Sequence, residues 1–353
     1  MTFSEPPKYS KSQINKAGKI LRTQEDVSSS DFESAIKIAE KWRACHAYPI
    51  NTFQSTLRTK LRSYHNEPIV AQRLKRMPTI IDKLQRYPNM QLTTMQDIGG
   101  LRAILGSVKD VYKLAKDYRE NERLPHELYN EDDHIQNPRD KDGYRSLHLM
   151  YKYNNPQTPR YNGLRVELQI RSRTQHIWAT AVETMGTFLG QALKSRQGDQ
   201  AWLDFFATVS SAFACMEKTP VLPRHNKMTE QEIFKAVANA EQELQALDKM
   251  RGYNVAADVI TKKGKNEGWF YHLIILNSLD KNVQIKPYNR DQLDKAIQDY
   301  AKIEAEAIKG KKIEPVLVAA GRFKTLKRAY PNFFLDISEF CKAVAQIKNK
   351  VKK

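Results

Sequence analysis

The sequence predicts an α/β fold in which a mixed sheet is flanked by helices, followed by a small C-terminal α+β domain. Three observations predict it. Short apolar runs with strand-like patterning lie at 97–105, 146–153 and 163–171, a helix-patterned segment lies between the first two runs, and helical segments precede and follow the group. Strands that alternate with helices are typical of a sheet with helices packed on its faces.

The N-terminal part of the chain is predicted to be mainly helical. Apolar residues recur at helical spacing in 30–44 and 51–64, and 10–22 has the composition of a basic surface helix. The segment 69–86 is also predicted as a helix, and Pro78 should kink or restart it.

After position 171 two helical segments run to Lys218, and their aromatic residues are expected in a core. The polar stretch 219–230 contains two prolines and predicts a linker, so the predicted domains are 1–218 and 231–353. The second domain shows no nucleophile, glycine-rich phosphate loop or metal-ligand cluster. Its patterns predict a helix at 229–250, a hairpin at 269–289, an amphipathic helix at 290–310, a strand at 314–321, and a final turn, short strand and basic helix.

Charge and composition narrow the function classes. The 353 residues carry a formal charge of +18, which predicts attraction to a polyanion such as RNA, DNA or an anionic membrane surface. No apolar run approaches the roughly 20 residues of a membrane helix, and the N-terminus is polar, so a cytoplasmic protein is expected. The three widely spaced cysteines are expected to be reduced thiols.

Two carboxylates, Asp97 and Glu167, are the first candidates for chemistry. Glu167, Gln169 and Arg171 share one face of a predicted strand whose other face is apolar. If Asp97 lies on a neighbouring strand, the two carboxylates can share a magnesium ion that also binds nucleotide phosphates, and Glu167 can accept a hydroxyl proton. The alternative is a polar sheet face that simply meets solvent.

A second group of candidates surrounds these carboxylates. Alternation places Arg102 on the strand face opposite Asp97 unless Gly99–Gly100 forms a bulge. A glycine turn precedes Tyr144, and a loop tyrosine that stacks on a base is a common way to hold a nucleotide. The alternative for Tyr144 is packing at a sheet end, and His148 alone would more often be structural.

The order and spacing of four motifs carry a resemblance to a known family. They are R-x-K-x-x-x-T-x-x-x-K at 73–83, D-I-G-G-L-R at 97–102, G-Y-R-S-L-H at 143–148 and E-L-Q-I-R at 167–171. Together they resemble the synthetase domain of the RelA/SpoT family, over the stretch from Asp31 to Lys218. The resemblance implies transfer of the β,γ-pyrophosphate of ATP to a ribose 3′ hydroxyl, with Mg²⁺ as cofactor.

The resemblance also implies roles at the matching positions. By it, Glu167, Asp97 and Tyr144 form the catalytic centre; Arg73 and Arg102 clamp the adenine; Lys75, Thr79 and Lys83 hold phosphates; Asp97 and Glu167 bind Mg²⁺; and Tyr144, Arg145, His148 and Gln169 bind the acceptor. One departure concerns the loop before Gly-Tyr, where the classical enzymes carry a lysine and an asparagine and this chain has Asp140 and Asp142. These acidic residues are expected to weaken contacts with the phosphates of a guanosine nucleotide.

The organisation of the whole chain resembles the CapRel group of fused toxin–antitoxin proteins that act in phage defence. Members of that group resemble toxic small alarmone synthetases that modify the CCA end of tRNA. Their zinc-finger-like C-terminal domain, here without zinc ligands, acts as internal antitoxin and as sensor of the phage major capsid protein. Tyr330 and Phe333 match the family's Tyr-x-x-Tyr neutralising motif, and ordinary core packing is the alternative for both.

Three functional hypotheses follow. The first is an ATP-dependent tRNA pyrophosphokinase toxin, autoinhibited and expected as a monomer. The second is an alarmone synthetase, and the third is an inactive nucleotide- or RNA-binding module. For the first hypothesis, candidate tRNA-binding cations are Lys16, Lys19, Arg58, Lys60 and Arg62, for which a solvated basic face is the alternative.

Overall fold

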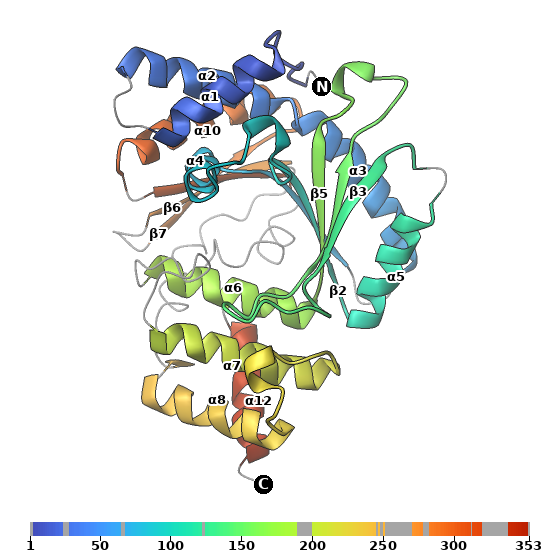
Figure 1. Cartoon of the computed structure of the whole chain (residues 1–353), viewed down its shortest axis with the longest axis vertical. Coiled ribbons are helices and arrows are strands. Elements are labelled where there is room, and N and C mark those ends of the chain that lie inside the picture. Colours follow the sequence, from blue (N-terminus) through green and yellow to red (C-terminus); the bar gives the residue numbers. More distant parts are fainter. Residues whose placement is uncertain are drawn as a thin grey trace.

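The computed structural model of the chain contains one eight-stranded mixed sheet, with helices packed against it and a helical bundle at one end (Figure 1). It describes residues 3–23, 28–64, 68–121, 124–188, 200–244, 246–247, 250, 270–277, 282–311, 313–319 and 338–351. In these ranges no helix combines the length and the apolar character that crossing a bilayer requires. The predicted fold class, a mixed sheet flanked by helices, is confirmed.

The sheet has the strand order β3-β4-β5-β2-β1-β8-β6-β7. Strand β2 pairs with β5 in parallel, and the other pairs are antiparallel. The strands are β1 (Ile69–Leu74), β2 (Gly99–Leu105), β3 (Glu127–Asp133), β4 (Leu147–Lys152), β5 (Arg165–Ser172), β6 (Tyr271–Asn277), β7 (Asn282–Tyr288) and β8 (Ile313–Ala319).

Helices form three groups around this sheet (Figure 1). The first group belongs to the N-terminal part of the chain, the second forms the bundle, and the third belongs to the C-terminal part. They are α1 (Lys11–Thr23), α2 (Ser29–Ala44), α3 (Ala47–Lys60), α4 (Met77–Arg86) and α5 (Val108–Arg119); then α6 (Arg173–Phe188), α7 (Gln200–Glu217), α8 (Glu230–Leu244) and α12 (Ser338–Val351); and α10 (Leu293–Ile308).

One face of the N-terminal strands forms a core with α3 and α5. Side chains alternate across a strand, so Val166, Leu168 and Ile170 of β5 all point to this core and are fully buried, as predicted. Phe53 of α3 and Leu114 of α5 pack against the same cluster. The alternate residues of the same strands therefore face the opposite side, where polar groups gather.

The structure corrects one prediction near the N-terminal strands and decides one alternative that the sequence left open. The segment predicted as a continuous helix over 69–86 divides into strand β1 and helix α4. Pro78 lies in the first turn of α4, where its missing N–H costs no hydrogen bond, so the predicted restart is confirmed. The bulge that Gly99–Gly100 would allow does not form, because β2 keeps a regular register with both neighbouring strands.

The C-terminal part continues the same sheet. Strand β8 pairs with β1 through Val318 and Arg73, and β6 and β7 extend the sheet beyond β8. Helix α8 and helix α12 pack on α7, where Phe205 and Phe340 meet in a second apolar core. The division at 219–230 remains a prediction, and the described residues on its two sides share both a sheet and a core.

Candidate active site

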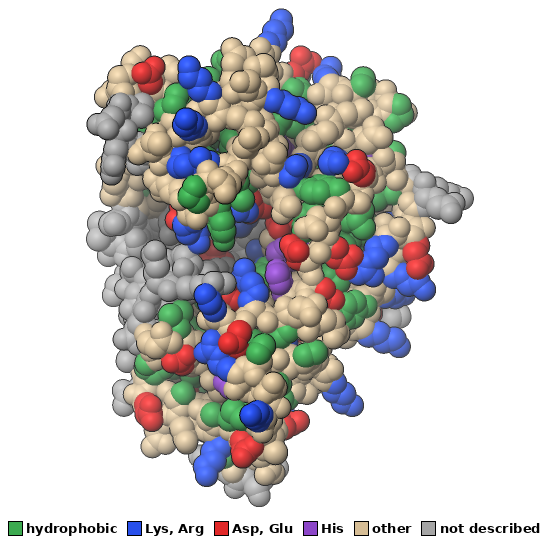
Figure 2. Space-filling view, in the orientation of Figure 1, with side chains coloured by type: hydrophobic (Ala, Val, Ile, Leu, Met, Phe, Trp, Pro, Cys, Tyr) green, Lys and Arg blue, Asp and Glu red, His purple; other side chains and the backbone are tan. Residues whose placement is uncertain are grey.

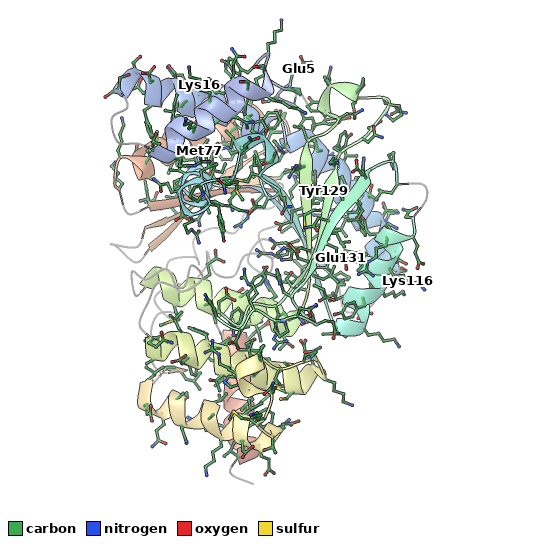
Figure 3. The ribbon with its side chains drawn as sticks, in the orientation of Figure 1. Glu5, Lys16, Met77, Lys116, Tyr129 and Glu131 are labelled. Atoms are coloured by element: carbon green, nitrogen blue, oxygen red, sulfur yellow. The ribbon has the colours of Figure 1, made fainter. Side chains whose placement is uncertain are left out.

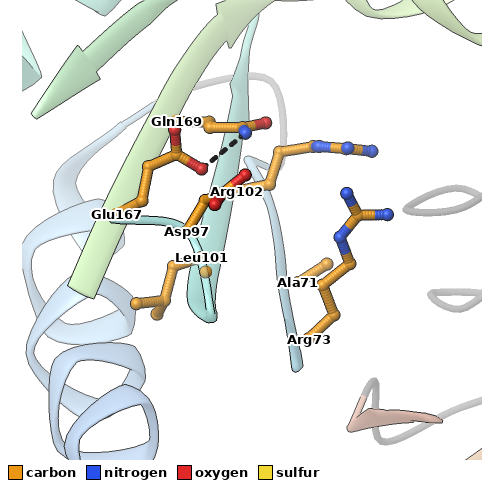
Figure 4. Close-up of a pocket in the computed structure, with 8 residues that line it drawn as sticks. Ala71, Arg73, Asp97, Leu101, Arg102, Glu167 and Gln169 are labelled. Carbon is orange, nitrogen blue, oxygen red and sulfur yellow. Dashed lines mark hydrogen bonds between the residues drawn. The ribbon is translucent and has the colours of Figure 1, made fainter. Parts of the chain in front are cut away.

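A pocket that is partly open to solvent lies on the polar face of β1, β2 and β5. Figure 4 shows Glu167 and Gln169 on one strand, with the Arg73 and Arg102 guanidinium groups extending to the same side. In Figure 2 this face of the molecule is hollowed at its middle, and basic, acidic and histidine side chains gather around the hollow. The pocket is lined by Ala71, Arg73, Asp97, Gly100, Leu101, Arg102, Glu167 and Gln169.

Strand register brings these residues together. Gly100 lies between Arg73 on β1 and Glu167 on β5, and Arg102 is paired with Gln169 two residues further on. A Cβ atom at Gly100 would lie 4.0 Å from Glu167 Oε2, so the absent side chain leaves the floor of the pocket open. Five residues from three strands therefore share one face of the sheet, as the predicted period of two requires.

Asp97 reaches the pocket from the turn before β2 rather than from the strand itself. This position explains how Asp97 and Arg102 line one pocket without a bulge. Its carboxylate is held by two ammonium groups: Lys75 Nζ lies 2.7 Å from Oδ2, and Lys83 Nζ lies 2.9 Å from Oδ1. Burial opposes ionisation of Asp97, yet Lys75 and Lys83 outweigh it and hold the Asp97 pKa below its usual range.

A chain of hydrogen bonds connects Glu167 to Tyr144. Glu167 lies 2.9 Å from His148 Nδ1 and accepts from Gln169 Nε2 at 2.8 Å. His148 Nε2 lies 2.9 Å from Tyr144 Oη, which also accepts from Arg171 Nη2 at 2.5 Å. The structure thus brings together four of the predicted acceptor and catalytic residues, and adds Arg171 to them.

The electrostatics of this chain favour charge on its members. Burial lowers the pKa of His148, but Tyr144 and Glu167 outweigh it and raise that pKa to about 9. Burial raises the pKa of Tyr144, but Arg171 and His148 outweigh it and lower that pKa to about 7. Burial likewise opposes ionisation of Glu167, and His148 reverses the effect, so the Glu167 pKa is lowered. These contacts favour the protonated imidazole of His148, which is placed between two acidic groups.

Arg145 does not join the pocket. It is buried, and its guanidinium donates to Ser210 Oγ at 3.0 Å and to the Pro220 carbonyl at 2.7 Å. Ser210 in turn donates to the carbonyl of Gly143 at 2.6 Å. The assignment of Arg145 to the acceptor therefore stays a prediction, and the bonds that the structure gives it fasten the Tyr144 loop to α7.

The two acidic residues of the loop are both paired. Asp142 lies 3.0 Å from Arg139, and its Oδ1 accepts from the Tyr144 backbone N–H at 3.1 Å. Asp140 lies 3.2 Å from Arg224, on the C-terminal side of α7. The expectation that these carboxylates would repel acceptor phosphates is therefore weakened, because nearby guanidinium groups balance their charge.

The other predicted residues lie farther from the pocket. Thr79 is half-buried in the first turn of α4. Lys16 and Lys19 are exposed on α1, Arg58 is exposed on α3 and Arg62 is exposed after it. Lys60 is engaged by α5, where its ammonium donates to the Asp117 carbonyl at 3.2 Å. Tyr330 and Phe333 lie outside the described residues.

Two arginines near Tyr144 were missing from the predicted site. Arg171 shares a strand face with Glu167 and Gln169, so the period of two could have identified it. Arg139 lies 4.5 Å from the centre of the Tyr144 ring and pairs with Asp142 three residues later, a spacing visible in the sequence. Both surround the ring with cationic groups.

Asp97 and Glu167 suit a magnesium ion by their chemistry. Mg²⁺ is usually bound by one or two carboxylates together with substrate phosphates. Both carboxylates line the same pocket, and each carboxylate oxygen contacts one protein donor, which leaves a second lone pair. Among the described residues there is no cluster of three or more His, Cys, Asp and Glu side chains that could hold a metal ion without substrate phosphates.

Comparison with protein families gives a match over residues 72–186 to the model described as the region found in RelA / SpoT proteins. The predicted resemblance to that family is confirmed for this segment, which contains most of the pocket. The chain is 32% identical over 114 residues to GTP pyrophosphokinase YwaC of Bacillus subtilis, a match that covers 31% of this chain and 52% of that protein. It is 30% identical over 134 residues to the uncharacterized protein Rv1366 of Mycobacterium tuberculosis, covering 36% of this chain and 43% of that protein.

Solved structures give similar partial matches. Small alarmone synthetase 1 of Bacillus subtilis, bound to its product pppGpp, is 21% identical with a TM-score of 0.42, and the match covers 49% of this chain and 89% of that one. Small alarmone synthetase 2 of the same organism is 21% identical with a TM-score of 0.42, covering 53% and 95%. The chain thus spans about half the length of the curated relatives it matches.

Proposed function

We propose that the chain transfers the β,γ-pyrophosphate of ATP to a ribose 3′ hydroxyl. The observation that carries the proposal is the pocket in which Asp97 and Glu167 lie among Arg73, Arg102 and the lysines that hold Asp97. Pyrophosphate transfer requires positioning and cationic stabilisation of a highly charged group, and this pocket offers both. The match of residues 72–186 to the RelA/SpoT model supports the same class of reaction, pyrophosphate transfer.

The reaction balances with residues of this chain. The 3′ oxygen attacks the β-phosphorus of ATP, the bond from that phosphorus to the α,β-bridging oxygen breaks, and AMP leaves. The ionised Glu167 accepts the hydroxyl proton, and His148 holds Glu167 in place. Mg²⁺ held by Asp97 and Glu167 supplies charge neutralisation on the transferred group when it is bound. Arg73 and Arg102 clamp the adenine, and Lys75, Thr79 and Lys83 hold phosphates.

The acceptor proposed first is the CCA end of tRNA, so that modification stops translation. A net charge of +18 supports a macromolecular polyanion, and exposed cations occur on α1 and α3. Tyr144 would stack on the terminal base, with His148 and Gln169 beside it. The loop before Gly143 still lacks the lysine and asparagine expected for guanosine nucleotides, although its carboxylates are balanced.

Alarmone synthesis is the second candidate, and the comparisons favour it. One similar protein is a GTP pyrophosphokinase, and one similar structure contains pppGpp, so both act on guanosine nucleotides. A non-catalytic nucleotide- or RNA-binding module is the third candidate. The hydrogen-bond chain from Glu167 to Tyr144 argues against it, since a binding site alone needs no such arrangement.

Control by the C-terminal part is proposed from the resemblance to CapRel proteins. Tyr330 and Phe333 would neutralise the donor site until phage major capsid protein binds, and the protein would act as a monomer in the cytoplasm. Deletion from position 225 is a poor test, because it removes α8 and α12 from the apolar face of α7. The variant Tyr330→Ala/Phe333→Ala is sharper, since it leaves both helices in place.

The deciding experiment supplies ATP labelled at the γ position together with bulk tRNA, GTP and GDP. It uses the full chain and the Tyr330→Ala/Phe333→Ala variant, and follows both labelled product and AMP. Glu167→Gln should abolish transfer. Glu127→Gln is the matched control, because Glu127 is an exposed carboxylate on β3 that pairs with Lys152.

The outcomes separate the three candidates. Label in tRNA, lost in Glu167→Gln and kept in Glu127→Gln, supports the tRNA proposal. Label confined to guanosine or adenosine nucleotides refutes it in favour of alarmone synthesis. If neither label transfer nor AMP appears in any variant, the chain is not a pyrophosphokinase.

A further inference from the structure

We infer that Glu304 of α10 is a positioning residue for the ATP site, because its carboxylate fixes the first turn of α4. Helix α4 carries Thr79 and Lys83, which the proposed function assigns to the phosphates of ATP, and the inference rests on that function for the identity of the nucleotide. Glu304 belongs to the C-terminal part of the chain. It therefore gives that part a supporting role at the site, distinct from the inhibitory role proposed for Tyr330 and Phe333.

Glu304 is the centre of a buried polar cluster between α2 and α10. Its side chain is 0% exposed, and Arg43 of α2, 3% exposed, donates to both of its oxygens at 2.9 and 2.7 Å. Tyr300 donates its hydroxyl to Glu304 Oε1 at 2.6 Å, and its ring lies 4.5 Å from the Arg43 guanidinium carbon. Removing one partner of such a buried ion pair destabilises the protein, because the other partner remains as an unpaired buried charge.

The same carboxylate reaches the start of α4. Glu304 Oε1 accepts a hydrogen bond from the backbone N–H of Met77, the first residue of that helix. Figure 3 labels Met77 where α4 meets the layer formed by α1 and α2. Helix α4 has no capping bond from the side chain of Arg76 and no acidic residue in its first turn. Glu304 thus supplies from another segment the acceptor and the negative charge that a helix N-terminus needs.

Further contacts connect this cap to the pocket. Lys83, two turns along α4, lies 2.9 Å from Asp97, so α4 is held by Glu304 at one end and by Asp97 nearer the other. Ile308 of α10 packs on the apolar cluster that contains Met77 and Ile80. Strand β8 also pairs with β1 at Arg73, which lines the pocket. Removing the cap should let α4 move and shift Lys83 away from the bound phosphates.

The test compares two variants that both lack the buried charges. A single change at Glu304 would leave Arg43 buried and charged opposite a neutral group, so both variants carry Arg43→Met. In Arg43→Met/Glu304→Gln an amide oxygen can still accept from Met77, whereas in Arg43→Met/Glu304→Met no acceptor remains. Glu306→Gln is the control on the same helix, because Glu306 is exposed and pairs with Lys311.

Two measurements are made on each full-length protein in the Tyr330→Ala/Phe333→Ala background, so that the inhibitory contact proposed for Tyr330 and Phe333 does not occupy the donor site. One is the affinity for adenosine 5′-(α,β-methylene)triphosphate with Mg²⁺ by calorimetry, and the other is amide hydrogen exchange of the peptide that covers 77–86. In that background Arg43→Met/Glu304→Met should bind the analogue about fivefold more weakly than Arg43→Met/Glu304→Gln, the factor expected for loss of a helix cap. Its α4 amides should also exchange faster, and Glu306→Gln should match the background protein.

Equal affinity and equal α4 exchange in the two double variants would overturn the positioning role. Failure of the background protein, Tyr330→Ala/Phe333→Ala, to bind the analogue would instead refute the proposed ATP site. In that case the exchange comparison still decides whether Glu304 holds α4, because exchange does not require a nucleotide. Binding is compared at a temperature at which the thermal unfolding curves show both double variants fully folded, so that weaker binding does not come from loss of folded protein.

Discussion

Gly143→Ala should destabilise the protein far more than Gly163→Ala, although both glycines have positive φ. Gly143 has φ 71° and Gly163 has φ 82°, a conformation that disfavours any residue with a Cβ. At Gly163 a new Cβ meets nothing within 4 Å, so only backbone strain remains. That strain costs about 1 kcal/mol.

At Gly143 the new methyl group also meets packed neighbours. It would lie 3.0 Å from the Ser210 Cβ, 3.2 Å from the Ala207 Cα and 3.3 Å from Trp178 Cζ2. Two of these atoms are close to the backbone of α7 and cannot turn away, so overpacking adds about 1–3 kcal/mol. The expected loss of unfolding free energy is therefore about 2–4 kcal/mol for Gly143→Ala, against about 1 for Gly163→Ala.

Urea unfolding at neutral pH measures both values, with equal m-values as the check that the denatured states are comparable. Because Gly143 precedes Tyr144, pyrophosphate transfer should fall with stability in Gly143→Ala and stay unchanged in Gly163→Ala. A Gly143→Ala protein as stable as Gly163→Ala would show that the loop is not fixed against α7 in the way the structure indicates.

Other predictions concern charge. Arg171 is the group that most strongly lowers the Tyr144 pKa against the effect of burial. In Arg171→Met, pH titration of phenolate absorbance should therefore show that the Tyr144 pKa has risen from about 7. An unchanged titration would contradict the role given to Arg171. The His148 pKa of about 9 lies above the ordinary 6.5, so its contribution to stability is full below pH 6.5 and is lost as the pH rises through 9; His148→Gln should flatten the unfolding free energy over that range. Arg145→Met should cost about 1.5–3 kcal/mol in urea unfolding because its bonds are buried, whereas Arg224→Met should cost about 1 kcal/mol or less because its ion pairs are partly exposed; equal losses would refute the distinction.

The local sequence pattern was sufficient to predict much of the sheet and which residues lie on its polar face. The alternation in β5 places Glu167 and Gln169 opposite the apolar core residues, and it follows from the sequence alone. The strand at Ile69–Leu74 was predicted as helix because its apolar residues merge with the helical pattern of α4. Strand β3, ELYNEDD, was not predicted, since its charges suit the edge position that it occupies but obscure strand periodicity.

The positions of residues outside regular strands could not be predicted from sequence alternation. Asp97 reaches the pocket through a turn, and the direction of Arg145 depends on Ser210 of a helix that is distant in sequence. The bond between Arg43 and Glu304 spans 261 residues and has no local signature. Such contacts follow from tertiary packing, which periodicity does not report.

The separation between Arg43 and Glu304 has a consequence for the nascent chain. At ribosomal rates of about 5–20 residues per second, the 261 residues between them take on the order of 10–50 s to synthesise. Throughout that interval the guanidinium lacks the Glu304 carboxylate, and the first N–H of α4 has no acceptor from α10. The N-terminal half is therefore completed last, only when the segment that follows it has left the ribosome, so that a newly made molecule cannot finish the proposed ATP site before most of its C-terminal part exists.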